Sequence, residues 1–288
     1  TAIAASSLAL MPGIVSCVQK DADPTTVFTG GTILTVDHSF SQAEALAISG
    51  QKIIAIGTQK EVLAIAGKNA KIVDLKGKIL LPGFIDPHTH VFTGSVVDSI
   101  MDYVGMARFG TVDEVLQYLK TIAKDKAPGE WIVVRNFDPS VQEGPNELTF
   151  TELDPISTQH PIFLLNASGH LAYANSKAFE VAGITEDVKN PSGAEYTRDA
   201  EGNLNGVIKN NLAFLPIWLS NPRVKELDVS DAITSLLGDF NAYGVTTTSD
   251  FSLGAATRTA SEFYLLLETS KREDFTARVM AYPLYSLN

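Results

Sequence analysis

The feature that most constrains the fold is a change in hydrophobic pattern that divides the chain. In the first part, the β-branched runs 27–36 (VFTGGTILTV), 45–56 and 71–81 are separated by turns that contain glycine. Such runs are typical of strands in an antiparallel sheet. In the second part, apolar stretches of strand length alternate with helical patterns, as in parallel βα units. The sequence therefore predicts an α/β protein with a small β domain, residues 27–82, and a larger region, residues 83–288.

In the larger region, capping residues mark the ends of two predicted helices. Thr111 and Glu114 form a capping box that predicts a helix over residues 112–125. Apolar residues at helical spacing from Val229 to Phe240 predict a second long helix, which Gly244 ends. We further expect strands at 131–137, 161–166, 245–250 and 277–285, helices at 176–182 and 257–270, and a hairpin or loop insertion at 190–211.

Composition excludes two classes of partner. The chain has 288 residues, of which 45% are hydrophobic and 19% charged, so it can bury a sizeable core. Its formal net charge is −11 and it has no run of lysine and arginine. Nucleic acids and anionic lipids require a concentrated positive surface. We therefore expect a small-molecule partner and no nucleic acid; nothing in the sequence indicates the oligomeric state.

The amino-terminal segment contains the only cysteine, so an intrachain disulfide is excluded. Residues 2–16 are uncharged, small and apolar, and they are too few to span a bilayer as a helix. Their last residues and Cys17 (IVSC) resemble a bacterial lipobox. Residues 1–16 are then a signal segment, Cys17 is the lipid anchor, and polar residues 17–26 are a tether in the bacterial cell envelope. An inert cysteine in a buried helix is the alternative.

Two histidines follow an apolar run at the start of the larger region, in the segment 83–90 (GFIDPHTH). Side chains two apart in a strand point the same way, so His88 and His90 share one face with Asp86. The apolar run 79–85 predicts a buried strand, and active sites of barrels are built at the carboxyl ends of strands. Neutral imidazole binds Zn²⁺ and similar metals well. The pair is a candidate metal site, with a structural histidine pair as the alternative.

The context of this motif resembles the amidohydrolase superfamily. A small β domain followed by the segment LPGFIDPHTHV resembles that superfamily in both domain order and sequence motif. Residues 159–184 (QHPIFLLNASGHLAYANSKAFEVAGI) and 244–252 (GVTTTSDFS) are similar to the branch that contains N-substituted formamide deformylase. The resemblance implies a (β/α)8 TIM-type barrel, incomplete in this chain, with a small β-sandwich domain. It also implies a metal-dependent hydrolase in which a metal-activated water attacks an amide, formamide or cyclic amide C–N bond.

The resemblance also implies roles for individual histidines. His88 and His90 become ligands of a divalent metal, with zinc as the expected ion. His170, in Ser-Gly-His after a buried-type strand, is expected to contact substrate, with a structural role as the alternative. His160 is interpreted as a turn residue and His38 as solvent-facing.

The sequence leaves the roles of several other polar residues open. Asp138 and Asp250 end predicted strands, where lining the barrel mouth and capping a turn are equally consistent with the sequence. Related enzymes commonly carry glutamate where Asn210 follows Lys209, and an amide cannot replace a carboxylate as a charged ligand. Lys209 is interpreted as a solvated lysine rather than a carboxylated one.

The sequence predicts an incomplete active site. No histidine follows His170, and residues 86–288 are fewer than the roughly 250 residues that a (β/α)8 barrel needs. We therefore expect truncation at both ends, with the catalytic base and the remaining ligands beyond residue 288. The alternative function is a non-catalytic ligand-binding lipoprotein on a degenerate or split scaffold.

Overall fold

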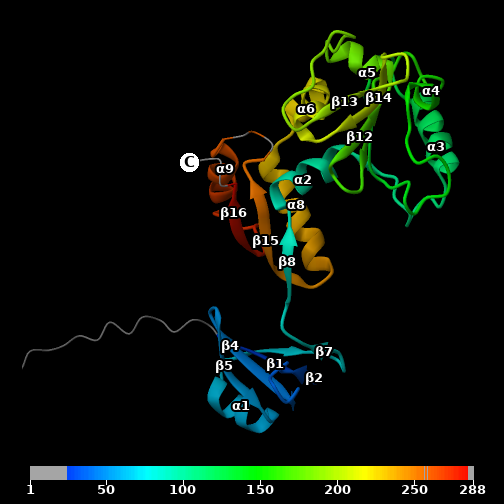
Figure 1. Ribbon diagram of the computed structural model, residues 1–288. Coiled ribbons are helices and arrows are strands. Elements are labelled where there is room, and N and C mark those ends of the chain that lie inside the picture. Colours follow the sequence, from blue (N-terminus) through cyan, green and yellow to red (C-terminus); the bar gives the residue numbers. More distant parts are fainter. Residues whose placement is uncertain (1–24, 256, 258, 285–288) are drawn as a thin grey trace, which may run out of the picture. The chain divides into compact units, whose positions relative to one another are not determined.

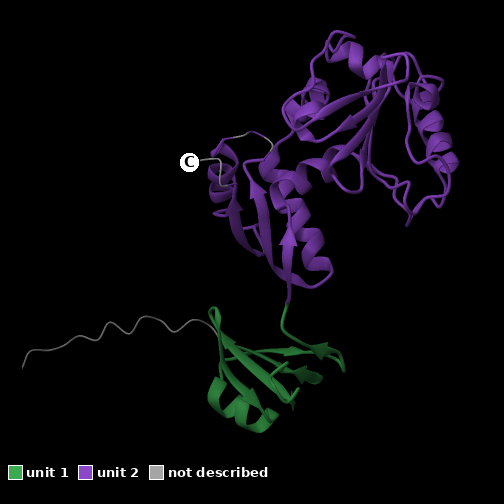
Figure 2. Ribbon diagram, in the orientation of Figure 1, with its two compact units in different colours: residues 1–83 green, residues 84–288 purple. Residues whose placement is uncertain are grey.

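A computed structural model describes residues 25–255, 257 and 259–284 (Figure 1). The chain divides into two compact units, residues 1–83 and 84–288 (Figure 2). The division falls beside the change in hydrophobic pattern. The expected signal segment and Cys17 lie outside the described residues.

The first unit is a mixed β structure with one helix. Two of its strand pairs are parallel, β1 with β6 and β2 with β7, so the expectation of a purely antiparallel sheet is wrong. The physical reason for the parallel β1–β6 pair is helix α1, which the sequence interpretation missed and which provides the crossover from β5 to β6. The elements are β1 Thr25–Thr29, β2 Thr32–Leu34, β3 Gln42–Ala43, β4 Ala45–Ser49, β5 Lys52–Gly57, α1 Gln59–Ala66, β6 Lys71–Asp74 and β7 Ile79–Leu80.

The second unit contains a three-stranded parallel sheet in the order β16-β15-β8. Three helices pack on it, and their shared core includes Val91, Ile233, Leu237 and Leu266. Burial of these side chains provides the main stabilisation of this sheet. The elements are β8 Phe84–Thr89, α2 Val91–Ile100, α8 Val229–Ala242, β15 Val245–Leu253, α9 Ser261–Thr269 and β16 Arg278–Pro283.

A second, six-stranded sheet lies in the chain between α2 and α8, in the order β13-β14-β12-β11-β10-β9. β9, β10 and β11 pair in parallel, whereas β12, β14 and β13 pair antiparallel with their neighbours. The expected hairpin is present as β13 and β14. The elements are β9 Asp102–Tyr103, α3 Val112–Asp125, β10 Ile132–Phe137, α4 Phe150–Leu153, β11 Ile162–Asn166, β12 Leu171–Ala174, α5 Ser176–Val181, β13 Glu195–Arg198, β14 Leu204–Lys209, α6 Asn211–Ser220 and α7 Pro222–Glu226.

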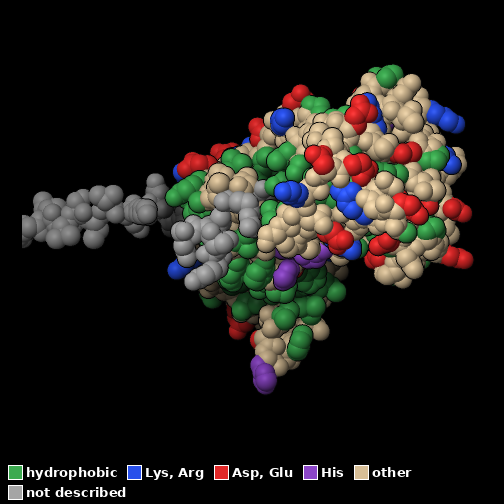
Figure 3. All heavy atoms as spheres, turned by 45° about the horizontal axis from the view of Figure 1, so that its top comes forward, with side chains coloured by type: hydrophobic (Ala, Val, Ile, Leu, Met, Phe, Trp, Pro, Cys, Tyr) green, Lys and Arg blue, Asp and Glu red, His purple; other side chains and the backbone are tan. Residues whose placement is uncertain are grey.

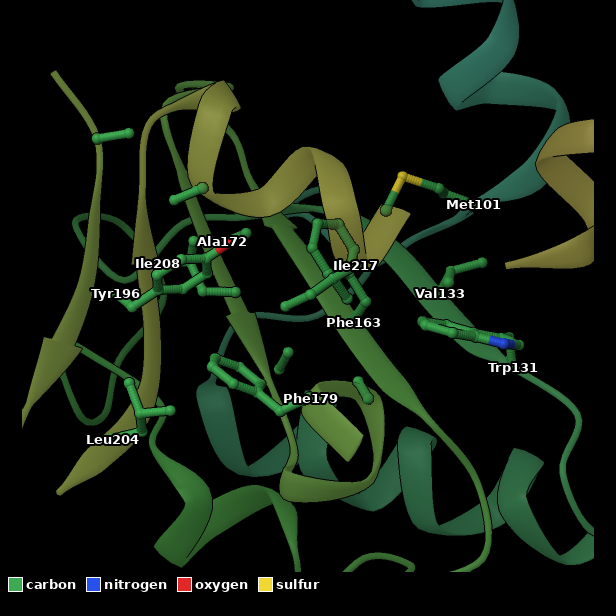
Figure 4. Packing of buried hydrophobic residues seen from close by; sticks show 14 of the residues in the cluster. Met101, Trp131, Val133, Phe163, Ala172, Phe179, Tyr196, Leu204, Ile208 and Ile217 are labelled. Atoms are coloured by element: carbon green, nitrogen blue, oxygen red, sulfur yellow. The ribbon is translucent and has the colours of Figure 1, made fainter. Parts of the chain in front are cut away.

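This inserted sheet is covered on both faces. Val133 belongs to one core cluster, whereas its neighbours Ile132 and Val134 belong to the other, as the alternation along a strand requires. Figure 4 shows the first cluster, in which Phe163 of β11 packs with Ile217 of α6. The inserted sheet therefore has a core of its own.

β10 and β11 pair in parallel, as expected of βα units, but they lie in the inserted sheet and not beside β8. The described residues form no closed barrel. One expectation about the barrel-type region is wrong. The first strand was expected to be buried, yet Phe84 is 55% exposed and Ile85 is 70% exposed. β8 is an edge strand that pairs only with β15, so one side of it has no covering element among the described residues. Figure 3 shows histidine side chains at the surface of the molecule.

No helix within the described ranges combines the length and the apolar character needed to cross a bilayer.

Candidate functional site

His88 and His90 lie together at the carboxyl end of β8. Their ring centroids are 5.5 Å apart and the rings are nearly perpendicular. Two imidazoles bound to one metal at about 2 Å, with a roughly tetrahedral angle, have centroids about 5 Å apart. The spacing of this pair therefore suits a shared divalent cation.

The neighbouring strand β15 orients both rings. The carbonyl oxygen of Phe251 lies 2.6 Å from Nδ1 of His90. A carbonyl can only accept, so Nδ1 carries the proton and Nε2 is left with its lone pair for a ligand. The ring of His88 stacks on the ring of Phe251 at 4.6 Å, and that ring stacks on Tyr282 of β16 at 4.5 Å. An aromatic stack across three strands thus restrains His88.

Thr89, between the two histidines, ties β8 to β15. Its Oγ1 donates to the carbonyl of Ser249 at 2.6 Å and lies 2.8 Å from Oγ1 of Thr248. These contacts fix the end of β8 in register with β15. The direction of both histidine side chains is therefore set by β15.

Asp250, which follows Ser249 on β15, is the functional candidate that sequence reasoning left unassigned. Its side chain is 1% exposed, and its Oδ2 accepts the N–H of Phe92 at 2.9 Å. His90 is the N-cap of α2 and makes no side-chain cap bond, so Asp250 satisfies this helix end from another strand. Asp250 therefore holds the turn that carries His90.

Burial raises the pKa of the Asp250 carboxyl to about 6. The N–H groups of Phe92 and Val91 and the charge of His90 lower the pKa, whereas nearby Glu262 raises it further. A buried carboxyl whose pKa is raised toward neutrality, beside two converging histidines, is typical of a functional site.

The described residues do not form a complete metal site. Over residues 25–255, 257 and 259–284, no cluster of three or more His, Cys, Asp or Glu is placed to hold a metal ion. His88 and His90 fit two positions of a tetrahedral site. The described part of the chain thus contains two histidines spaced for a shared cation and no complete ligand set.

A cavity of about 390 Å³ adjoins His90. Thr89 and His90 form part of its wall, and the remainder comes from α2, α8 and the segments at the ends of β10 and β11. Its volume falls in the range of about 300–1,000 Å³ that is usual for small-molecule sites.

The other histidines lie apart from this cavity wall. His170 is exposed and is not part of the cavity wall, although the preceding residue, Gly169, is. His160 is buried, and its Nδ1 lies 3.0 Å from the carbonyl of Glu130, so it is a structural residue before β11. His38 is exposed in the first unit.

The remaining polar candidates have local partners. Asp138 accepts the N–H and the hydroxyl of Ser140 within a turn. Lys209 pairs with Glu195 at 3.0 Å, which explains it as an ordinary charged lysine. Asn210 has φ +67° and donates to the carbonyl of Gly193 at 2.8 Å, so it stabilises the hairpin end and the start of α6.

Comparison with known proteins identifies relatives along most of the chain. The sequence profile of the amidohydrolase family matches residues 71–286. N-substituted formamide deformylase of Arthrobacter pascens is 31% identical over 247 residues, which are 85% of this chain and 45% of that protein. Protein LONG AFTER FAR-RED 3 of Arabidopsis thaliana is 31% identical over 204 residues, 70% of this chain and 33% of that protein.

A solved structure shares the fold. An uncharacterised metal-dependent hydrolase of Pyrococcus furiosus superposes with a TM-score of 0.57 at 21% identity, over 90% of this chain and 50% of that one. The chain spans half or less of the length of these three proteins.

Proposed function

Because the chain belongs to the amidohydrolase family, we propose that it forms part of a metal-dependent hydrolase that cleaves the C–N bond of a small amide, formamide or cyclic amide. One observation carries the proposal: His88 and His90 converge at the carboxyl end of a parallel strand, beside the buried carboxyl of Asp250. The likeness to N-substituted formamide deformylase supports the C–N bond as the reacting bond.

The residues of this chain have distinct tasks in the proposed site. His88 and His90 would hold a divalent metal, zinc being the expected ion, which when bound lowers the pKa of a coordinated water. The Phe251 carbonyl keeps Nε2 of His90 unprotonated, and Asp250 holds the turn behind it. We further propose that β8, β15 and β16 belong to a TIM-type barrel, whose other strands supply the catalytic base and the remaining ligands. His170, next to the cavity wall, is proposed to contact substrate at its rim.

Zinc binding tests this proposal directly. The purified chain is titrated with Zn²⁺ in a calorimeter, alongside His88→Ala and His90→Ala, with His38→Ala as the matched control in the other unit. We expect both site variants to bind at least about tenfold more weakly, because each loses one of two nitrogen ligands. The control should match the wild type. Equal zinc affinity in all four proteins would refute the metal site.

Hydrolysis is then tested with zinc-loaded protein that also carries the remaining barrel strands, using N-benzylformamide and following release of benzylamine. Release that depends on both His88 and His90 supports the hydrolase. The absence of a third grouped ligand among the described residues favours one alternative, a non-catalytic binding protein on the same scaffold. Zinc binding with no hydrolysis of any amide offered would support that alternative.

We also propose that Cys17 carries a lipid anchor that holds the protein at the bacterial cell envelope. The proposal rests on the IVSC sequence at residues 14–17. After expression in a bacterial envelope, intact-mass analysis should show an added diacylglycerol that Cys17→Ala lacks. An unmodified, freely soluble wild-type product would contradict the anchor.

A further inference from the structure

The cavity beside His90 is lined by both apolar and polar side chains. Large apolar side chains come from α2 and α8 and are called the apolar wall, whereas an arginine and two asparagines at the carboxyl ends of β10 and β11 are called the polar wall. The division resembles small-molecule sites, in which an apolar lining holds the ligand and a few polar groups fix its orientation. The apolar wall contains Val97, Leu236 and Phe240, and the polar wall contains Arg135, Asn136 and Asn166.

Arg135 has more donors than partners. Its Nη2 donates to the carboxylate of Asp98 on α2, and its Nη1 donates to Oδ1 of Asn136 at 2.9 Å. The guanidinium also lies over the ring of Tyr103, 5.3 Å from the centroid. A guanidinium has five N–H groups. Its Nε is shielded from solvent and has no acceptor among the described residues, so the ion pair satisfies this group only in part.

Asn136 is held in an unusual backbone conformation next to Arg135. Its φ is +63°, and the pairing of β10 with β11 changes register between Arg135 and Phe137. A bulge of this kind re-aims side chains, and strained residues of this kind concentrate at functional sites. The Oδ1 of Asn136 is used by Arg135, which leaves its NH₂ group without a protein acceptor among the described residues. The bulge thus places a second donor in the polar wall.

The charge of the polar wall is balanced. Arg135 is paired with Asp98, and both line the cavity. Neither Asn136 nor Asn166 adds charge. A carboxylate ligand would gain the attraction of Arg135 and meet the repulsion of Asp98, whereas a neutral carbonyl oxygen accepts hydrogen bonds without that repulsion.

We propose that this cavity binds the substrate and that the Arg135–Asp98 pair selects uncharged amides over carboxylates. Arg135 and Asn136 donate to the amide carbonyl, and the apolar wall holds a substituent of the amide. The inference rests on the proposed hydrolase function, because it names the substrate class of that enzyme. Arg135 is here a binding and specificity residue.

The test measures binding to metal-free protein, so it is independent of catalysis. The probes are N-benzylacetamide and 3-phenylpropionate, which share a phenyl group and differ in charge. Titration calorimetry on wild type should show tighter binding of the amide. Arg135→Met should weaken amide binding about tenfold, the usual effect of losing hydrogen bonds from a charged donor. Arg198→Met removes an ion-paired arginine outside the cavity wall and should leave binding unchanged.

Asp98→Asn provides a second test that preserves side-chain shape. Removing this negative charge leaves Arg135 uncompensated, so 3-phenylpropionate should bind several-fold more tightly while the amide changes little. Thermal unfolding confirms that each variant is folded. Tighter binding of the carboxylate by wild type, or equal amide binding by wild type and Arg135→Met, would overturn the inference. Binding as expected without hydrolysis by zinc-loaded protein that also carries the remaining barrel strands would instead refute the enzyme and leave the cavity assignment standing.

Discussion

Replacing Asp250 by asparagine should stabilise the metal-free protein at neutral pH. The folded-state pKa of Asp250 is about 6, against 3.8 for an unperturbed carboxyl. Each pH unit of that difference corresponds to about 1.4 kcal/mol, so ionising Asp250 in the folded state costs about 3 kcal/mol. Asparagine keeps an oxygen that can accept the N–H of Phe92 and carries no charge. The variant therefore removes the cost and retains the helix cap.

The sign of the pH dependence makes this prediction specific. Because the folded pKa lies above the unfolded one, the cost is absent below about pH 4 and fully present above about pH 6. Urea unfolding of both proteins with a chelator at pH 4, 5, 6 and 7 should show Asp250→Asn gaining up to about 3 kcal/mol relative to wild type. A difference that stays constant with pH, or that grows toward acid, would refute the reasoning.

An exposed aspartate provides a control of opposite sign. Hydrogen bonds from the Asn203 backbone hold the pKa of the Asp199 carboxyl below its usual range. A lowered folded pKa means that its contribution is present near neutral pH and is lost as the pH falls. Asp199→Asn should therefore lose stability relative to wild type as pH rises, which the same unfolding series measures.

Three further predictions concern helix capping, core packing and the histidine geometry. Thr111→Ala removes the capping box of α3 and should lower the free energy of unfolding by about 1 kcal/mol, as chemical denaturation measures; no change would contradict the cap. Phe163→Ala empties a site that is 1% exposed and should cost about 3–5 kcal/mol in the same assay. Phe251→Leu removes the ring that stacks on His88 and should weaken zinc binding several-fold by calorimetry, and unchanged affinity would show that the stack is not needed.

Local features of the structure were predictable from the sequence. The helix over residues 112–125 is confirmed, with Thr111 as its N-cap and Glu114 at the third helical position, and the two form the expected capping box. The convergence of His88 and His90 follows from the parity of a single strand. Each of these features depends on residues a few positions apart.

Features that depend on distant pairing were not predictable. Asp250 could not be assigned because its role requires β15 to lie beside β8. The apolar pattern of a strand does not predict which strand pairs with it. For the same reason the sequence did not reveal the inserted sheet, because a strand buried on both faces has the same apolar pattern in a barrel and in an inserted sheet. The exposure of Ile85 was missed for a related reason: an apolar side chain indicates a preference for burial, not the presence of a cover.

β8 and β15 are neighbours in the sheet but lie far apart in the sequence, which affects how the site forms during folding. Thr89 and Thr248 are in hydrogen-bond contact although they are 159 residues apart. Closing so long a loop in an unfolded chain carries an entropic cost and slows folding. The inserted sheet has its own core, and the helices on either side of it, α2 and α8, share a cluster that includes Val91 and Ile233. If the inserted sheet folds first, it holds α2 and α8 near each other. β15 then has only a short distance to cover before it pairs with β8 and orients the histidines.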